Sequence, residues 1–336
     1  MQYTSVGDIA YSFLMRGHNT RIKSEIGDLS QRLASGMKTD VSKHLRGEFS
    51  GLAAIERSIR SLEAHQTAQR ETTTLLETAQ VTLGSIQDIT TEMAPALISA
   101  GNSSHPALLQ SLAADAEQKL DSVVSALNVR VADRAVFSGR STDRAALPSG
   151  REILDALSAD LAGAATPFDL ANQIDIWFDD PAGGFATTIY QGADAPIAPI
   201  PVSDTEAVDF RLTANASELR NLLKSIAKAA LVVELPQLSD TKDQATFLKS
   251  AGEAMLTTQT DLALLRADVG ALESYNDIAK TRANTSLSAF EIARSEIYKA
   301  DPYEVATALE LAQTQLEAVY TLTARISRLS LSDYLR

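Results

Sequence analysis

The sequence predicts a mainly α protein, in which the N- and C-terminal thirds form a long antiparallel helical bundle or coiled coil and a small α/β insert domain lies between them. Apolar residues recur every three or four positions near both ends of the 336-residue chain, as in a coiled-coil seam. Aromatic residues make up only 5% of the chain, whereas β-sandwiches favour aromatic and β-branched side chains. The middle instead carries turn-forming Pro and Gly residues between short periodic segments.

Composition narrows the possible functions. The formal net charge of −13 argues against nucleic acid as a partner, because phosphate binding needs a basic surface. The chain has no cysteine, which excludes disulfides, thiolate catalysis and cysteine-bound zinc. Its longest purely apolar run, Ala229–Val233, is far shorter than the roughly 20 residues that cross a bilayer, so no membrane partner is expected. The segment Ile9–Met15 is too short for a cleavable secretory signal, so another export route would have to carry the chain.

Helices are expected throughout the N-terminal third. The first ends at Gly36, which is free to take the left-handed conformation. A second helix is expected from Leu52 to about Met93, with Pro95 ending it. A third begins at Pro106 and continues to about residue 134. The irregular stretch between the first two helices holds a basic cluster, for which a solvated loop is the default interpretation: Lys43, His44 and Arg46.

The middle is expected to mix short helices with strands. Ser149 and Glu152 have the spacing of a capping box, and Thr166 followed by Pro167 begins another helix. Residues 185–190 are compatible with a strand, and residues 208–212 alternate apolar and polar side chains as a strand does.

The C-terminal third returns to helix. After a helix capped by Ser217, a long helix is expected over residues 243–294. The segment Asp301–Glu304 then has the pattern of a sharp helix start, with Asp at the cap, Pro at the first position and Glu at the third. The helix that follows carries the most regular heptad run of the chain, at Val305, Leu309, Ala312, Leu316, Val319, Thr323 and Ile326.

The apolar seams of the first and last helices are thin, and the sequence suggests no second apolar face beside them. A lone helix of this kind is marginal in water. Periodicity alone leaves two arrangements open: the seams cover each other within one chain, or sister molecules cover them in a polymer. The candidate assembly residues are Ile22, Ile26, Leu29, Leu33, Val305, Leu309, Ala312, Leu316, Val319 and Ile326.

Several segments resemble the bacterial flagellin family. In the N-terminal part these are residues 31–37, 50–54 and 75–79, and in the C-terminal part Arg266, Gly270, Asn276, residues 295–297, Asp301, Glu304, Gln313, Gln315 and the tail 329–335. The turn Phe137, Ser138 and Gly139 is similar to one in the hook-associated members of that family. The resemblance covers residues 1–140 and 250–336, but the loop 43–51 departs from the family pattern of Asp-Asp-Pro/Ala-Gly.

The resemblance implies a structural subunit of the extracellular bacterial flagellum that connects hook to filament through coupled folding and assembly of its terminal helices. The implied partners are further copies in an axial ring, a neighbouring hook-associated protein, flagellin, and a type III export chaperone on the C-terminal helix. The implied domains are terminal coiled-coil segments (1–45 with 296–336), a helical shaft (46–149 with 236–295) and an outward insert (150–235).

No catalytic residue, metal site or cofactor is expected. The histidines do not have the spacing of metal ligands, and the Ser-x-x-Lys pattern occurs three times, as chance would produce in a Ser-rich chain. Asp179 and Asp180 precede a turn but lack the alternating acidic positions of a calcium loop. The alternatives to a junction subunit are flagellin itself, a non-flagellar coiled-coil interaction protein such as a signalling hairpin, and an enzyme housed in the insert.

Overall fold

The computed structural model describes residues 6–39, 49–102 and 105–334, with side chains described over 13–39, 49–102 and 105–325. The chain divides into two compact units, one made of residues 1–62 with 285–336 and the other of residues 63–284. Helices dominate both units, so the predicted mainly α class is confirmed. Among the described residues, no helix has the length and apolarity needed to cross a membrane.

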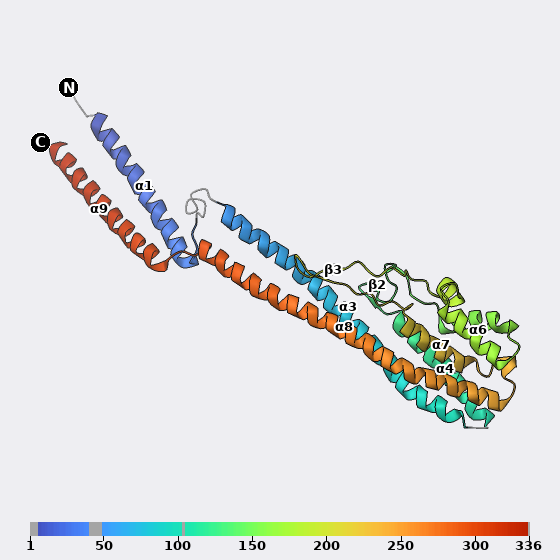
Figure 1. The fold of residues 1–336 in the computed structure, drawn as a ribbon. Coiled ribbons are helices and arrows are strands. Elements are labelled where there is room, and N and C mark those ends of the chain that lie inside the picture. Colours follow the sequence, from blue (N-terminus) through green and yellow to red (C-terminus); the bar gives the residue numbers. More distant parts are fainter. Residues whose placement is uncertain (1–5, 40–48, 103–104, 335–336) are drawn as a thin grey trace. The chain divides into compact units, whose positions relative to one another are not determined.

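The first unit is built on two helices from the opposite ends of the chain. Helix α1 (Val6–Ser35) and helix α9 (Pro302–Tyr334) lie side by side and antiparallel, so the start of α1 and the end of α9 lie at the same end of the pair (Figure 1). Gly36 follows α1 with a φ of +68°, the left-handed conformation expected at a helix C-terminus. Asp301 caps α9 as predicted, because its side-chain oxygen accepts from the main-chain nitrogen of Tyr303 at 2.9 Å.

The second unit is organised around residues 63–100 of the long helix α3 (Ser50–Ala100) and residues 241–284 of the long helix α8 (Thr241–Tyr298), which run antiparallel beside each other (Figure 1). The prediction that Pro95 ends the second helix is wrong, because α3 continues through it to Ala100. A proline inside a helix costs about 3 kcal/mol. Packing offsets that cost here, since Ala94, Leu97 and Ala100 are all buried.

The third helix is shorter than predicted. Helix α4 spans Pro106–Leu127, and a small hairpin follows in which β1 (Arg130–Val131) pairs antiparallel with β2 (Arg134–Ala135). The turn between the strands places Ala132 and Asp133 at φ values of +47° and +61°. Two consecutive residues in the left-handed conformation form the tight turn of this hairpin, which takes the place of the predicted last turns of the helix.

The short helices of the middle begin where local signals predict them. Helix α5 (Gly150–Asp160) has a complete capping box formed by Ser149 and Glu152, and α6 (Pro167–Asp179) has one formed by Thr166 and Asp169. Short 3₁₀ turns at Leu161–Gly163 (η1) and Pro236–Leu238 (η3) complete the connections. Ser217 is not the cap of α7 (Ser217–Leu231) but its first residue, and its hydroxyl donates to Glu218 instead.

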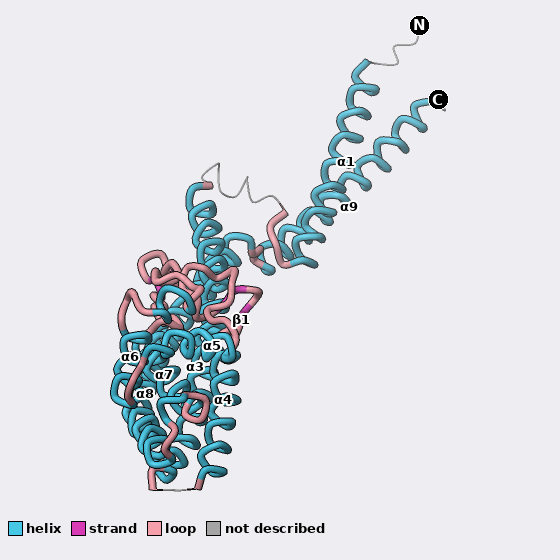
Figure 2. The backbone as a smooth tube through the Cα atoms, turned by 90° about the vertical axis from the view of Figure 1, so that its right-hand side faces the viewer, coloured by secondary structure: helices cyan, strands magenta, loops and turns pink. Residues whose placement is uncertain are grey.

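The strand predictions for the middle are mostly wrong. Residues Phe185–Ile189 (η2) form one π-helical turn, whose Phe185 ring stacks on Phe178 with centroids 5.3 Å apart. Only β3 (Ile200–Pro201) and β4 (Ala207–Val208) form a ladder, and β4 stops before the alternating run ends. Figure 2 shows how little of the described backbone is strand. The alternation of apolar and polar residues over 208–212 predicted a longer strand than the one that forms. A loop that packs on helices can also bury every second side chain.

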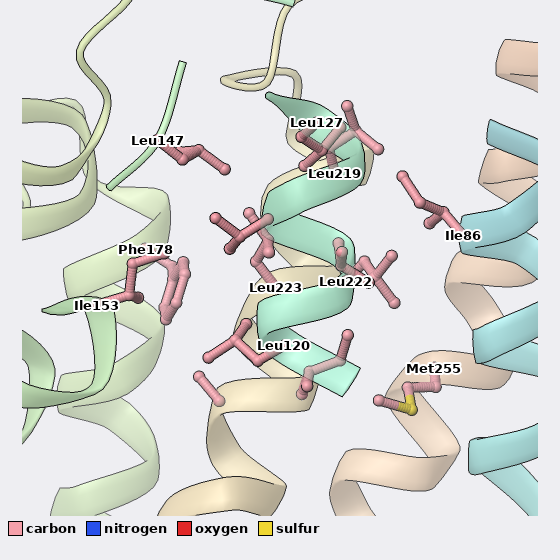
Figure 3. Packing of buried hydrophobic residues seen from close by; sticks show 14 of the residues in the cluster. Ile86, Leu120, Leu127, Leu147, Ile153, Phe178, Leu219, Leu222, Leu223 and Met255 are labelled. Carbon is pink, nitrogen blue, oxygen red and sulfur yellow. The ribbon is translucent and has the colours of Figure 1, made fainter. Parts of the chain in front are cut away.

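One continuous hydrophobic core joins the helices of residues 63–284. Figure 3 shows its centre, where side chains of α4 and α7 interdigitate and α3, α5, α6 and α8 close the sides. The fully buried members labelled there include Ile86, Leu120, Leu127, Leu147, Ile153, Phe178, Leu219, Leu222, Leu223 and Met255. The short middle helices therefore share a core with the long ones.

Candidate assembly interface

The predicted seams of α1 and α9 meet each other within one chain. Ile22 and Leu29 are 8% and 9% exposed, and Val305 and Ala312 are 7% and 4% exposed. Leu29, Val305 and Ala312 belong to one small hydrophobic cluster, against which Ile26 and Leu309 also pack. Of the two arrangements that periodicity left open, the structure shows the one in which the seam is closed intramolecularly.

The closure is incomplete at both ends of the seam. Leu33 is 41% exposed although it continues the repeat of Ile22, Ile26 and Leu29. Leu316 and Val319 are only half-buried, and the side chain of Ile326 lies outside those that the structure describes. These positions stay a prediction as assembly residues.

A short main-chain connection holds the two helices together at their inner ends. Met37 forms an isolated antiparallel bridge with Lys299. The main-chain nitrogen of Lys38 donates to the carbonyl of Tyr298 at 2.8 Å, and that of Ala300 donates to the carbonyl of Gly36 at 2.9 Å. These bonds involve only main-chain atoms. They therefore fix the register of α1 against α9 independently of the apolar side chains in the seam.

A polar contact lies farther along the pair. The ammonium of Lys23 lies 5.7 Å from the ring centroid of Tyr320. Hydrogen bonding to Lys23, and then to Asn19, lowers the pKa of the Tyr320 hydroxyl from its ordinary value. The contact joins α1 to α9 beyond the buried cluster, which agrees with their antiparallel register.

The expectation of no second apolar face is wrong. Outside the seam, Phe13 and Leu14 on α1 are 77% and 61% exposed, and Leu311 and Leu322 on α9 are 60% and 47% exposed. Leu311 and Leu322 are eleven residues apart, which is close to three helical turns, so they share one side of α9. Together with the seam, these exposed apolar side chains are the candidate interaction surface of the terminal pair.

The Phe137-Ser138-Gly139 turn has a structural role in the other unit. Phe137 and Ser138 are fully buried, and the Ser138 hydroxyl donates to the carbonyl of Arg144 at 2.9 Å. Gly139 has a φ of +59°, and a β-carbon there would collide with the carbonyl oxygens of Ala193 and Ala195. The turn thus anchors the 191–195 loop, and glycine is required because the loop passes too close for any side chain.

Two polar residues of the C-terminal family pattern, Arg266 and Asn276, face α3. Arg266 donates to the side-chain oxygens of Gln80 at 3.3 Å and Gln87 at 2.6 Å, and Gln80 donates back to the carbonyl of Arg266 at 2.7 Å. Asn276 donates to the carbonyl of Gln69 at 3.0 Å. Sequence analysis singled out Arg266 and Asn276 but missed their glutamine partners on α3. The one sequence signal that could have indicated these glutamines is that they are polar residues at inward positions of the helix.

Two predicted features cannot be placed. The basic cluster of Lys43, His44 and Arg46 lies outside the described residues, as does most of the loop 43–51. The side chains of the tail 329–335 also lie outside those described. Among the described residues, no group of three or more His, Asp or Glu side chains is arranged to hold a metal ion.

Comparisons with known proteins agree with these geometric features. Residues 252–335 match the bacterial flagellin C-terminal helical region. A structure described as a flagellar hook-associated protein from Vibrio parahaemolyticus superposes with a TM-score of 0.51 at 14% identity, over 73% of this chain and 95% of that one. FlgL from Bacillus cereus superposes with a TM-score of 0.50 at 18% identity, over 72% of this chain and 98% of that one. No curated protein sequence matches the chain. Residues 252–335 are thus similar to the flagellin C-terminal helical region, and the chain shares its fold with the two flagellar structures.

Proposed function

We propose that the protein is a structural subunit of the bacterial flagellum, the hook-associated protein 3 that connects hook to filament. The observation that carries the proposal is the pairing of the two chain ends in α1 and α9, with large apolar side chains left exposed on them, in a chain whose residues 252–335 match the flagellin C-terminal region. Such a pair has a seam that is closed at its centre and apolar side chains exposed outside it, which is what a subunit needs to add to a growing axial structure.

Coupled folding and assembly follows from the same geometry. The terminal pair buries few side chains for its length, so its order depends on further contacts that neighbouring subunits supply. The partners we assign are further copies in the axial ring, a neighbouring hook-associated protein and flagellin. A type III export chaperone would bind the C-terminal helix α9 before export, because that helix carries exposed apolar residues that need cover in the cytoplasm.

The domain assignment is part of the proposal. Residues 1–45 with 296–336 would be the terminal coiled-coil segments, 46–149 with 236–295 the helical shaft, and 150–235 the outward insert. The insert shares its core with the shaft helices, so it would act as a rigid thickening of the shaft. The protein would act outside the cell after type III export, and its role would be structural and not enzymatic.

Electron microscopy of a deletion strain tests the proposal. We expect hooks without filaments, flagellin lost to the medium, and recovery of filaments when the gene is supplied on a plasmid. Normal filaments on the hooks of the deletion strain would refute a junction role.

Flagellin is the second candidate, and the match to the flagellin C-terminal region favours it. The two roles differ in stoichiometry, because a filament holds far more subunits than a junction ring. Quantitative mass spectrometry of sheared filaments separates them: a filament subunit would dominate the sheared material, whereas a junction subunit would be a trace component.

A further inference from the structure

Helix α8 presents a second apolar stripe on the side that its own unit does not cover. Its members follow one another at intervals of three, four, four and three residues, which keeps them on one side of a helix over about 21 Å. They are Leu264, Ala267, Ala271, Tyr275 and Ile278, all exposed. Leu264, Ile278 and Tyr275 are 62%, 48% and 38% exposed. We call this set the α8 stripe.

The α8 stripe is distinct from the surface that packs on α3. The buried residues Leu262, Val269, Asn276 and Ala279 form their own repeat on α8 and face the interior. The helical rotation of 100° per residue places them on a different side from the stripe. The helix thus has two apolar surfaces, and the fold accounts for only one of them.

Acidic side chains border the α8 stripe. Asp261 is three residues before Leu264 and Asp268 is four residues after it, so both lie next to the stripe on the helical wheel. Neither carboxylate forms an ion pair or a side-chain hydrogen bond within the described part of the chain. An apolar stripe bordered by unpaired carboxylates fits a partner surface that is apolar with a basic border.

The same unit carries a surface of that complementary kind. A pocket of about 310 Å³ lies between α3, the β1–β2 hairpin and the segment before β3. Its apolar lining includes Leu75, Val131, Val136, Ile197 and Ile200. The α8 stripe contributes no residue to this lining, so the two surfaces are separate.

The hairpin segment that contributes to the pocket has an excess of basic residues, in a chain whose net charge is −13: residues 130–144 hold four arginines and two aspartates. Arg130, Arg134, Arg140 and Arg144 are all exposed, and the pocket lining itself includes Arg134 and the acidic Glu71. Within the described residues, neither Arg134 nor Arg140 has a carboxylate partner. These two guanidinium groups are therefore available to the carboxylates of another molecule.

We propose that copies of this chain associate head to tail, the α8 stripe of one copy seating against the hairpin pocket of the next, with Asp261 and Asp268 meeting the arginines of the hairpin segment. Because the two surfaces differ, the contact is heterologous, and repeating it generates a ring or a helical array in place of a closed dimer. The proposal deepens the proposed function, on which it rests, by naming the lateral contact between subunits.

Cysteine cross-linking in the full-length, assembled protein tests the contact, because the chain has no cysteine of its own. Ala271→Cys places a thiol on the stripe and Thr74→Cys places one at the pocket, and both positions are exposed. With a short bis-maleimide, the double variant should give a ladder of dimers, trimers and larger species, while each single variant gives none. A control pair replaces Thr74→Cys by Asp160→Cys on α5, which lies outside the pocket lining.

Two results would overturn the proposal. Cross-linked dimers of the Ala271→Cys variant alone would mean that two α8 stripes pair with each other. A double variant that assembles but gives no ladder would mean that the α8 stripe and the pocket do not meet. If the double cysteine variant fails to assemble, a charge-reversal experiment tests the contact instead. Asp268→Arg and Arg140→Asp should each reduce incorporation on the order of tenfold, with unchanged melting of the monomer, and the combination should restore it. Failure of the combination to restore incorporation would reject the pairing.

The same strains separate this inference from the proposed function. If wild-type protein is absent from isolated hook–filament material, the proposed function fails. If wild-type protein is present and both charge-reversal variants are incorporated equally well, the junction role stands and the contact assigned here is wrong.

Discussion

The side-chain nitrogen of Asn276 on α8 lies 3.0 Å from the main-chain carbonyl oxygen of Gln69 on α3, and it donates a hydrogen bond there in a fully buried position. It also donates to the hydroxyl of Thr73 at 2.9 Å. The side chain of Gln69 in turn donates to the carbonyl of Val202 at 2.7 Å. One polar layer therefore ties the two long helices to the turn between β3 and β4 and fixes their register.

Removing this layer should destabilise the unit of residues 63–284. Asn276→Ala removes both hydrogen bonds that this side chain donates to α3, while the Gln69 carbonyl still accepts from the Thr73 hydroxyl, so we expect a loss of about 1 kcal/mol in the free energy of unfolding. Denaturant unfolding followed by circular dichroism measures it. Ser274→Ala, on the exposed side of the same helix, is the matched control and should change stability little. Equal effects of the two variants would contradict the assignment.

Gly139 should tolerate no side chain. Gly139→Ala adds a β-carbon at a left-handed position against the carbonyls of Ala193 and Ala195, so we expect a loss on the order of 1–3 kcal/mol. Gly163→Ala is the control, because nothing lies near its added β-carbon. Thermal unfolding of the two variants should separate them clearly, and a Gly139→Ala protein with unchanged melting would count against the anchoring role of the turn.

The closed seam should be sensitive to charge where it is buried. Ala312→Asp places a carboxylate at a position that is 4% exposed between α1 and α9, which costs several kcal/mol unless the pair opens. We expect the variant to lose incorporation into the hook–filament structure while the main unfolding transition of residues 63–284 stays unchanged. Gln315→Asp, at an exposed position on the same helix, should be incorporated normally.

Amide hydrogen exchange of the full-length monomer should separate the two units. The terminal pair buries one small cluster, whereas α3 and α8 border the main core, so we expect α1 and α9 to exchange much faster. Exchange should slow in α1 and α9 on assembly. Protection of α1 and α9 equal to that of α3 in the dilute monomer would argue against coupled folding and assembly.

Glu273 should make stability depend on pH. Burial, followed by the charges of Glu77 and Asp277, raises the pKa of the Glu273 carboxyl above its ordinary value. Its ionised form is thus disfavoured in the folded protein, and the folded state gains stability as pH falls through the raised folded pKa. Glu273→Gln should therefore raise Tm at pH 7, and the gain should disappear below about pH 4.3, where the unfolded carboxyl is also protonated. A Tm difference that does not change between pH 7 and pH 4 would contradict this.

The sequence by itself determined the features that depend on a few neighbouring residues. The capping boxes of Ser149 and Thr166, the left-handed Gly36 and the helix start at Asp301 all form as their local patterns predict. Each is decided within one helical turn, so no distant contact can easily override it. The heptads of α1 and α9 likewise predicted Ile22, Leu29, Val305 and Ala312 as inward positions, and these four side chains are buried.

Tertiary structure decided what depends on distant packing. Helix α3 continues through Pro95 because the core buries the turn that follows it. Residues Phe185–Ile189 form a helical turn in which the ring of Phe185 stacks on that of Phe178. The pairing of Asn276 with Gln69, more than two hundred residues apart, leaves no trace in local periodicity. Packing energies summed over many buried side chains exceed local preferences of a few kcal/mol, so only the assembled fold reveals which residues meet.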